Sequence, residues 1–201
     1  MFHDFVLHAI SNGETDFEHE TCEQAQKLLT RFNWEINSLI KQHRLAAIGD
    51  ALWYLYSYQW GFTADVLDDS VSGGYSEFYH SLEFLYDKGF ATHCVNCRGH
   101  SDFGKNHFAT ACYMLWDMDS GLDYLSFHGS PERFKLVSQL IDFGLRHHHA
   151  AVQESFLHCL GHRRNEMADF VDSKLIVFLQ REDISPEIRE YAIQCRTGRV
   201  A

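Results

Sequence analysis

One apolar pattern occurs four times along this chain, with hydrophobic residues at positions i, i+4 and i+7. Residues at these spacings lie on one face of an α-helix, so each occurrence predicts a helix that buries one stripe of its surface. The four stripes are Ile48, Leu52, Leu55; Phe108, Cys112, Leu115; Val152, Phe156, Cys159; and Ile188, Ala192, Cys195. Because no alternating apolar and polar segment of useful length occurs, the sequence predicts an all-α protein.

Each stripe follows another amphipathic segment of the same period, and two such segments in succession predict a helical hairpin. The preceding segments begin at Ala25, Phe78, Phe134 and Val171. We therefore expect a single domain, residues 1–201, that contains four hairpins and one insertion. The expected hairpins span about 20–57, 75–118, 131–162 and 167–199, and the insertion spans 57–75.

The last hairpin carries the clearest local signals for a helix start. Ser185 is a good N-cap, Pro186 suits the first helical position, and Glu187 suits the first turn. The run DISPEIREYAIQCRTGR, residues 183–199, resembles the second helix of a HEAT-type repeat. The places of the family's acidic residue, Pro-Glu pair, apolar residue, arginine and small residue are filled by Asp183, Pro186, Glu187, Ile188, Arg189 and Ala192.

A looser match to the same repeat occurs in AAVQESFLHCLGHR, residues 150–163, where Gln153 stands at a position for which the family prefers arginine. The first two hairpins match in periodicity alone. The resemblance implies an α-solenoid, a right-handed superhelix of about four HEAT-like hairpins. Solenoids of this kind expose long curved surfaces, which mostly bind other proteins.

The charge of the chain is strongly negative, with 28 acidic residues against 17 lysines and arginines. A protein of this net charge repels the phosphate backbones of nucleic acids, so nucleic-acid binding is not expected. A basic protein partner is expected instead. Charges interrupt every apolar run before the roughly 18 residues that a membrane helix needs. No basic segment precedes the short apolar stretch at the start of the sequence, as one would in a signal peptide. We therefore expect a cytoplasmic protein with no membrane span.

The stretch ATHCVNCRGHSDFGKNH, residues 91–107, contains soft metal ligands at close spacing. Cys94, Cys97, His100 and His107 could supply two thiolates and two imidazoles to zinc. The spacing is tighter than that of common zinc fingers, and there is no second Cys-x-x-Cys pair. Since loop-forming residues surround these ligands, we expect a surface connection that binds no metal.

Histidines are also concentrated at 147–149 and at 158 and 162. His158 and His162 are one helical turn apart and could face one metal ion. The residues between them include no glutamate, so the His-Glu-x-x-His pattern of zinc proteases is absent. We expect structural roles for these histidines, with a metal-dependent enzyme that uses them or the Cys94–His107 loop as the alternative.

The insertion combines aromatic and acidic residues, a composition typical of a contact surface for a cationic protein. The candidate partner-binding residues in and near it are Tyr58, Trp60, Phe62, Asp65, Asp68 and Asp69. Glu154, Glu187 and Glu190 on the second helices are further candidates. No nucleotide-binding or serine-hydrolase motif occurs, so neither catalytic residues nor a cofactor are expected.

These features favour a non-catalytic protein-binding module. One specific form is an acidic inhibitor or immunity-type protein that neutralises a basic effector such as a toxin. HEAT-like folds also include nucleic-acid repair enzymes, which remain an alternative, but such an enzyme needs a basic concave face that this sequence does not provide.

Overall fold

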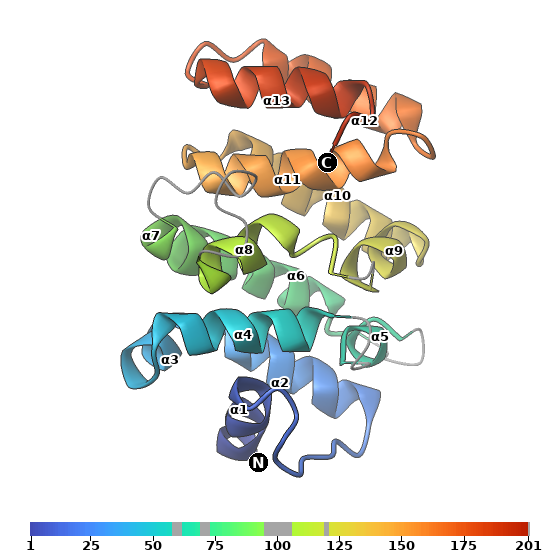
Figure 1. Cartoon of the computed structure of the whole chain (residues 1–201). Coiled ribbons are helices and arrows are strands. Elements are labelled where there is room, and N and C mark those ends of the chain that lie inside the picture. Colours follow the sequence, from blue (N-terminus) through green and yellow to red (C-terminus); the bar gives the residue numbers. More distant parts are fainter. Residues whose placement is uncertain (58–61, 69–72, 95–105, 119–120, 201) are drawn as a thin grey trace.

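The computed structural model describes residues 1–57, 62–68, 73–94, 106–118 and 121–200. Within these ranges the secondary structure is helical and contains no strand, which confirms the all-α prediction (Figure 1). The helical elements are α1 (Phe2–Ile10), α2 (Cys22–Trp34), α3 (Ile36–Gln42), α4 (Leu45–Tyr56), α5 (Phe62–Val66), α6 (Tyr75–Phe84), the π-helical η2 (Leu85–Phe90), α7 (Ala91–His93), α8 (His107–Met114), α9 (Gly121–Phe127), α10 (Pro131–Arg146), α11 (Ala150–Arg163), α12 (Ala168–Leu179) and α13 (Pro186–Arg196).

The longer helices pack in two neighbouring rows. In one row α2 contacts α6, α6 contacts α10, and α10 contacts α12. In the other row α4 contacts α8, α8 contacts α11, and α11 contacts α13. Figure 1 shows the resulting tiers, from α1 and α2 at the N-terminal end to α12 and α13 at the C-terminal end.

The local chemistry of the helix starts agrees with the sequence. The Ser185 side chain accepts a hydrogen bond from the backbone N–H of Ile188, and Pro186 is the first residue of α13. Ser130 caps α10 in the same way, with Pro131 as its first residue. In both cases the serine satisfies a backbone donor that has no partner within the helix.

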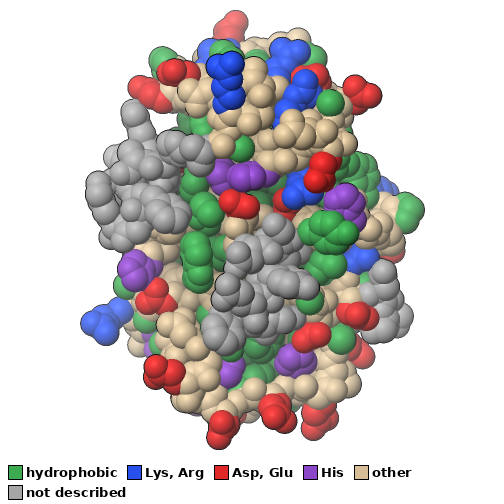
Figure 2. Space-filling model, turned by 45° about the vertical axis from the view of Figure 1, so that its right-hand side comes forward, with side chains coloured by type: hydrophobic (Ala, Val, Ile, Leu, Met, Phe, Trp, Pro, Cys, Tyr) green, Lys and Arg blue, Asp and Glu red, His purple; other side chains and the backbone are tan. Residues whose placement is uncertain are grey.

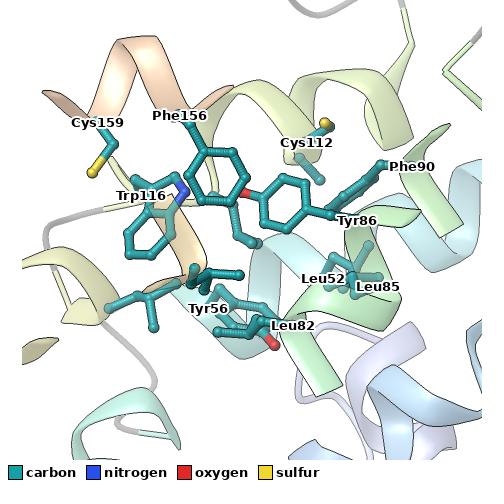
Figure 3. Close-up of a cluster of buried hydrophobic side chains, with 14 of the residues drawn as sticks. Leu52, Tyr56, Leu82, Leu85, Tyr86, Phe90, Cys112, Trp116, Phe156 and Cys159 are labelled. Carbon is teal, nitrogen blue, oxygen red and sulfur yellow. The ribbon is translucent and has the colours of Figure 1, made fainter. Parts of the chain in front are cut away.

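All twelve residues of the four apolar stripes are buried. Figure 3 shows the part of this core in which Tyr86, Trp116 and Phe156 meet. The Phe156 ring centroid lies 4.6 Å from that of Tyr86 and 5.6 Å from that of Trp116. Buried rings of this size contribute much of the hydrophobic stabilisation of a core.

Among the described helices, α1 and α9 lie outside both the predicted hairpins and the predicted insertion. α1 packs against α4, and α9 packs against α10 and α5. α5 itself belongs to the predicted insertion and also packs on α2, so this part of the insertion is folded onto the body of the protein. Among the described helices, none is both long and apolar enough to cross a membrane.

Candidate functional site

Three metal-ligating side chains converge where the turn after α8 meets α11. Asp117 lies in that turn, and His158 and His162 lie one turn apart on α11. The Nε2 atoms of the two histidines are 3.2 Å apart. The Asp117 Oδ2 atom lies 3.7 Å from Nε2 of His158 and 3.5 Å from Nε2 of His162. Among the described residues, this is the one group of three or more such side chains whose ligand atoms are mutually close.

The triangle formed by these three atoms has the size of a metal coordination shell. Ligand atoms about 2.05 Å from a zinc ion, at tetrahedral angles, are about 3.3 Å from one another. The observed separations of 3.2, 3.5 and 3.7 Å lie close to that value. A small divalent ion could therefore bind here with only minor movement of the side chains.

The orientation of His158 is fixed by two tyrosines. Its Nδ1 atom lies 2.8 Å from the hydroxyl of Tyr191 on α13, and that hydroxyl lies 2.9 Å from the hydroxyl of Tyr113 on α8. The ring of Tyr113 also packs on the imidazole, with centroids 4.2 Å apart. When Nδ1 carries the proton and donates it to Tyr191, the lone pair on Nε2 is directed at the other two ligand atoms. Outer-shell contacts of this kind are typical of histidines that bind metals.

The protonation states of the two more exposed groups suit metal binding. Burial lowers the pKa of His162 below its usual value, and the neighbouring His158 lowers it further. Burial acts to raise the pKa of Asp117, but the adjacent His158 and His162 hold it below its usual value. At neutral pH the site therefore presents a neutral imidazole and a carboxylate, which are the forms that bind a metal ion.

One side of the site is open. The His158 side chain is 2% exposed, whereas those of His162 and Asp117 are 34% and 33% exposed. Figure 2 shows, on the face that it draws, histidine side chains beside acidic ones. Because three ligands occupy one side of a tetrahedral ion, a fourth position would face this opening.

A partly buried ion network adjoins the site. Arg163 follows His162 on α11, and its Nη2 and Nη1 atoms lie 2.6 Å from Asp123 and 2.8 Å from Glu166. Burial raises the pKa of Asp123 to about 7, although the charge of Arg163 opposes this. The ion pair with Asp123 holds the last turn of α11, which carries His162, against α9.

Of the four candidate zinc ligands between Cys94 and His107, the structure describes Cys94 and His107. Cys97 and His100 lie outside the described residues. Cys94 is fully buried, so the expectation that it lies in a surface connection is wrong. His107 contacts the carboxylate of Asp50 on α4, which gives it a partner other than the cysteines.

The predicted partner-binding residues differ in whether the structure describes them and in how exposed they are. Tyr58, Trp60 and Asp69 lie outside the described residues, whereas Asp68, Glu187 and Glu190 are exposed. Asp65 is partly exposed and hydrogen-bonded to His19 at 2.7 Å.

Two of the predicted partner-binding residues are buried and therefore not accessible to a partner. Phe62 is 4% exposed, since it packs among the rings of Phe5, Phe17 and Tyr54. Glu154 is 8% exposed and lies within α11. Their assignment as partner contacts is therefore corrected: both are buried in the folded chain.

No known protein family, curated protein or solved structure matches this chain. Function is therefore inferred from the geometry of the chain's own side chains. Sequence reasoning identified His158 and His162 as a pair but missed Asp117, which is 41 positions from His158 and adjacent to it through the packing of α8 on α11.

Proposed function

We propose that this protein is a metalloprotein in which Asp117, His158 and His162 bind one divalent transition-metal ion. The observation that carries the proposal is the triangle of ligand atoms with sides of 3.2, 3.5 and 3.7 Å. Two imidazoles and one carboxylate suit zinc in tetrahedral geometry, and the same set occurs in the facial triad of non-haem iron enzymes.

The chemistry of such a site follows from its open position. Structural zinc sites are closed by four protein ligands, whereas catalytic sites use three and leave the fourth to water or substrate. A zinc ion held here would lower the pKa of a bound water to about 7 and polarise a carbonyl or phosphoryl oxygen. We therefore favour a metal-dependent, hydrolysis-type activity over a purely structural ion.

The scaffold we propose for this site is a HEAT-like α-solenoid. The proposal is supported by the two rows of stacked helices and by the resemblance of residues 183–199 to the repeat. In such a stack the ligands come from two successive tiers, because Asp117 follows α8 and the histidines lie on α11.

Metal content and affinity test the proposal. Purified protein should bind one zinc ion per chain in calorimetry, and Co²⁺ should give the visible absorption of a four-coordinate site. The variants His158→Ala, His162→Ala and Asp117→Asn should each lose affinity by at least tenfold. The matched control is His80→Ala, which removes an exposed histidine on α6 and should bind as the parent does. Wild-type protein that binds none of Zn²⁺, Co²⁺ or Fe²⁺, or three ligand variants that bind like the control, would overturn it.

A second candidate is a cytoplasmic protein-binding module that takes a basic partner, in the manner of an inhibitor or immunity protein. The net charge of −11 and the exposed Asp68, Glu187 and Glu190 favour it. Electrostatic steering would make association fall as salt rises, because exposed charges are screened beyond about 8 Å at physiological ionic strength. A partner co-purified from native cells should associate more slowly with the triple variant Asp65→Asn, Asp68→Asn, Asp69→Asn, and unchanged kinetics would count against this candidate.

A further inference from the structure

The hydroxyl of Tyr191 connects the proposed metal site to the last helix of the chain. Tyr191 lies on α13, is 8% exposed, and contacts Nδ1 of His158 at 2.8 Å. Asp117, His158 and His162 all lie outside α13, which contributes no ligand. The contact is therefore a link between the metal shell and a helix that does not itself bind the metal.

We propose that Tyr191 is the positioning residue of this site, and that metal binding and the docking of α13 onto α11 stabilise one another through it. This inference rests on the proposed function, since it requires a metal at His158. It adds a form of regulation: whatever displaces α13 releases metal, and loss of metal loosens α13.

The physical reason lies in the two nitrogens of one imidazole. A metal on Nε2 requires the proton to be on Nδ1, and it withdraws electron density from the ring, which makes Nδ1–H a stronger donor. Without metal, the His158 proton can instead reside on Nε2 and be donated to Nε2 of His162, 3.2 Å away. The tautomer of His158 is then less constrained. The hydrogen bond to Tyr191 is therefore stronger in the metal-bound protein than in the metal-free one.

The position of α13 makes this coupling measurable. α13 packs on α11 and α12 at the C-terminal end of the stack, through the stripe of Ile188, Ala192 and Cys195. Terminal elements open locally at a lower free energy than the centre of a protein. A change in the Tyr191 contact should therefore alter the opening of α13 before it alters global unfolding.

Linkage fixes the relation between the two effects. If metal reduces the opening of α13 by some factor, closing α13 must raise metal affinity by the same factor. Loss of an outer-shell partner usually lowers metal affinity by about 10- to 100-fold. We expect a change of this size in both measurements.

Hydrogen exchange on the full chain, with and without one equivalent of zinc, tests the proposal. Zinc should slow the exchange of α13 amides by at least tenfold in wild-type protein, but not in Tyr191→Phe, whose zinc affinity should fall 10- to 100-fold. Its Co²⁺ spectrum should also shift, which a merely structural role would not cause. The matched control is Tyr56→Phe, which removes a buried tyrosine hydroxyl bonded to Asn33 at 2.9 Å in the N-terminal half. That variant should keep wild-type zinc affinity and the α13 response.

Two further variants keep the test decisive if Tyr191→Phe does not fold. His162→Ala leaves Tyr191 in place but weakens the metal site, so zinc should no longer protect α13. Ile188→Ala removes packing of α13 without touching a ligand, so zinc affinity should fall in proportion to the fraction of protein in which α13 is closed. If wild-type protein binds zinc and Tyr191→Phe binds it equally well, with α13 exchange unaffected by zinc, this inference is wrong and the proposed function stands. If wild-type protein binds no metal, both are wrong.

Discussion

Asp123 on α9 and Arg163 on α11 form an ion pair of 2.6 Å in which the side chains are 4% and 10% exposed. The pair joins two helices that belong to different parts of the sequence. One oxygen of Asp123 and the Nε of Arg163 have no hydrogen-bond partner among the residues that the structure describes. A buried carboxylate with incomplete hydrogen bonding depends strongly on its counter-charge.

Replacing Arg163 by Met should therefore lower the free energy of unfolding by about 3–5 kcal/mol, because a buried carboxyl loses its partner. The effect should grow with pH. Burial already raises the pKa of Asp123 to about 7, and without Arg163 it rises further. When the pKa of a carboxyl is higher in the folded than in the unfolded protein, the free energy of unfolding falls as pH rises through the interval between these two pKa values. In wild type this fall ends near pH 7, whereas in the variant it continues to higher pH. The difference between wild type and variant should thus increase between pH 7 and pH 9 in urea unfolding with EDTA present.

The double variant Arg163→Met, Asp123→Asn is the control for this pH effect. It has no ionisable carboxyl at position 123, so its stability relative to wild type should lack the steep fall above pH 7. A single variant whose destabilisation is the same at pH 7 and pH 9 would show that Asp123 is not held by Arg163.

Gly144 allows the close approach of α10 and α11. A Cβ atom at Gly144 would lie 1.9 Å from the Phe156 ring, which is fully buried and in contact with Tyr86 and Trp116. Gly144→Ala should destabilise the protein by about 1–3 kcal/mol through overpacking, although alanine is the better helix former. Glu132→Ala, at an exposed position of the same helix, should change stability by less than about 0.5 kcal/mol. Equal urea midpoints for the two variants would contradict the packing.

The sequence predicted the helices that bury regular stripes, since a repeated i, i+4, i+7 pattern has one simple structural solution. It did not predict α1 or α9. α9 is short, and part of its burial comes from contacts with α5 and α10, which local periodicity does not encode. Asp117 was missed for a similar reason, because it acquires its neighbours from α11 through tertiary packing and has no ligand-like spacing in the sequence.

For the cysteines, the sequence made a prediction that the structure contradicts at Cys94. Cys94 and Cys97 form one Cys-x-x-Cys pair and stand among loop residues, so the sequence predicted a surface connection. Cys94 is instead buried at the end of α7, where its backbone N–H donates to the carbonyl oxygen of Phe90 at 2.8 Å. The loop-forming residues near Cys94 can be read from the sequence, but nothing in the sequence indicates that the Cys94 side chain is part of the core.

Burial of Cys94 changes the expected effect of its replacement. Cys94→Ser places a hydroxyl where an apolar thiol was buried, so the free energy of unfolding should fall by about 1–3 kcal/mol. The loss should be the same with and without EDTA, because it arises from packing and not from metal binding. Denaturant unfolding in both buffers measures this, and a loss that vanishes in EDTA would instead indicate that Cys94 binds a metal.

The terminal hairpin gives the last prediction. Ala192 is fully buried in α13, between Ile188 and Cys195 on the stripe that faces α11. Ala192→Asp puts an unpaired charge into this contact at a cost of several kcal/mol. α13 should detach before the remaining tiers unfold, because its contacts lie at one end of the stack. We expect a lower melting temperature and rapid hydrogen exchange confined to α12 and α13. Ile193→Asp, at a half-exposed position of the same helix, is the control and should melt close to wild type. If both variants melt like wild type, α13 does not bury this face.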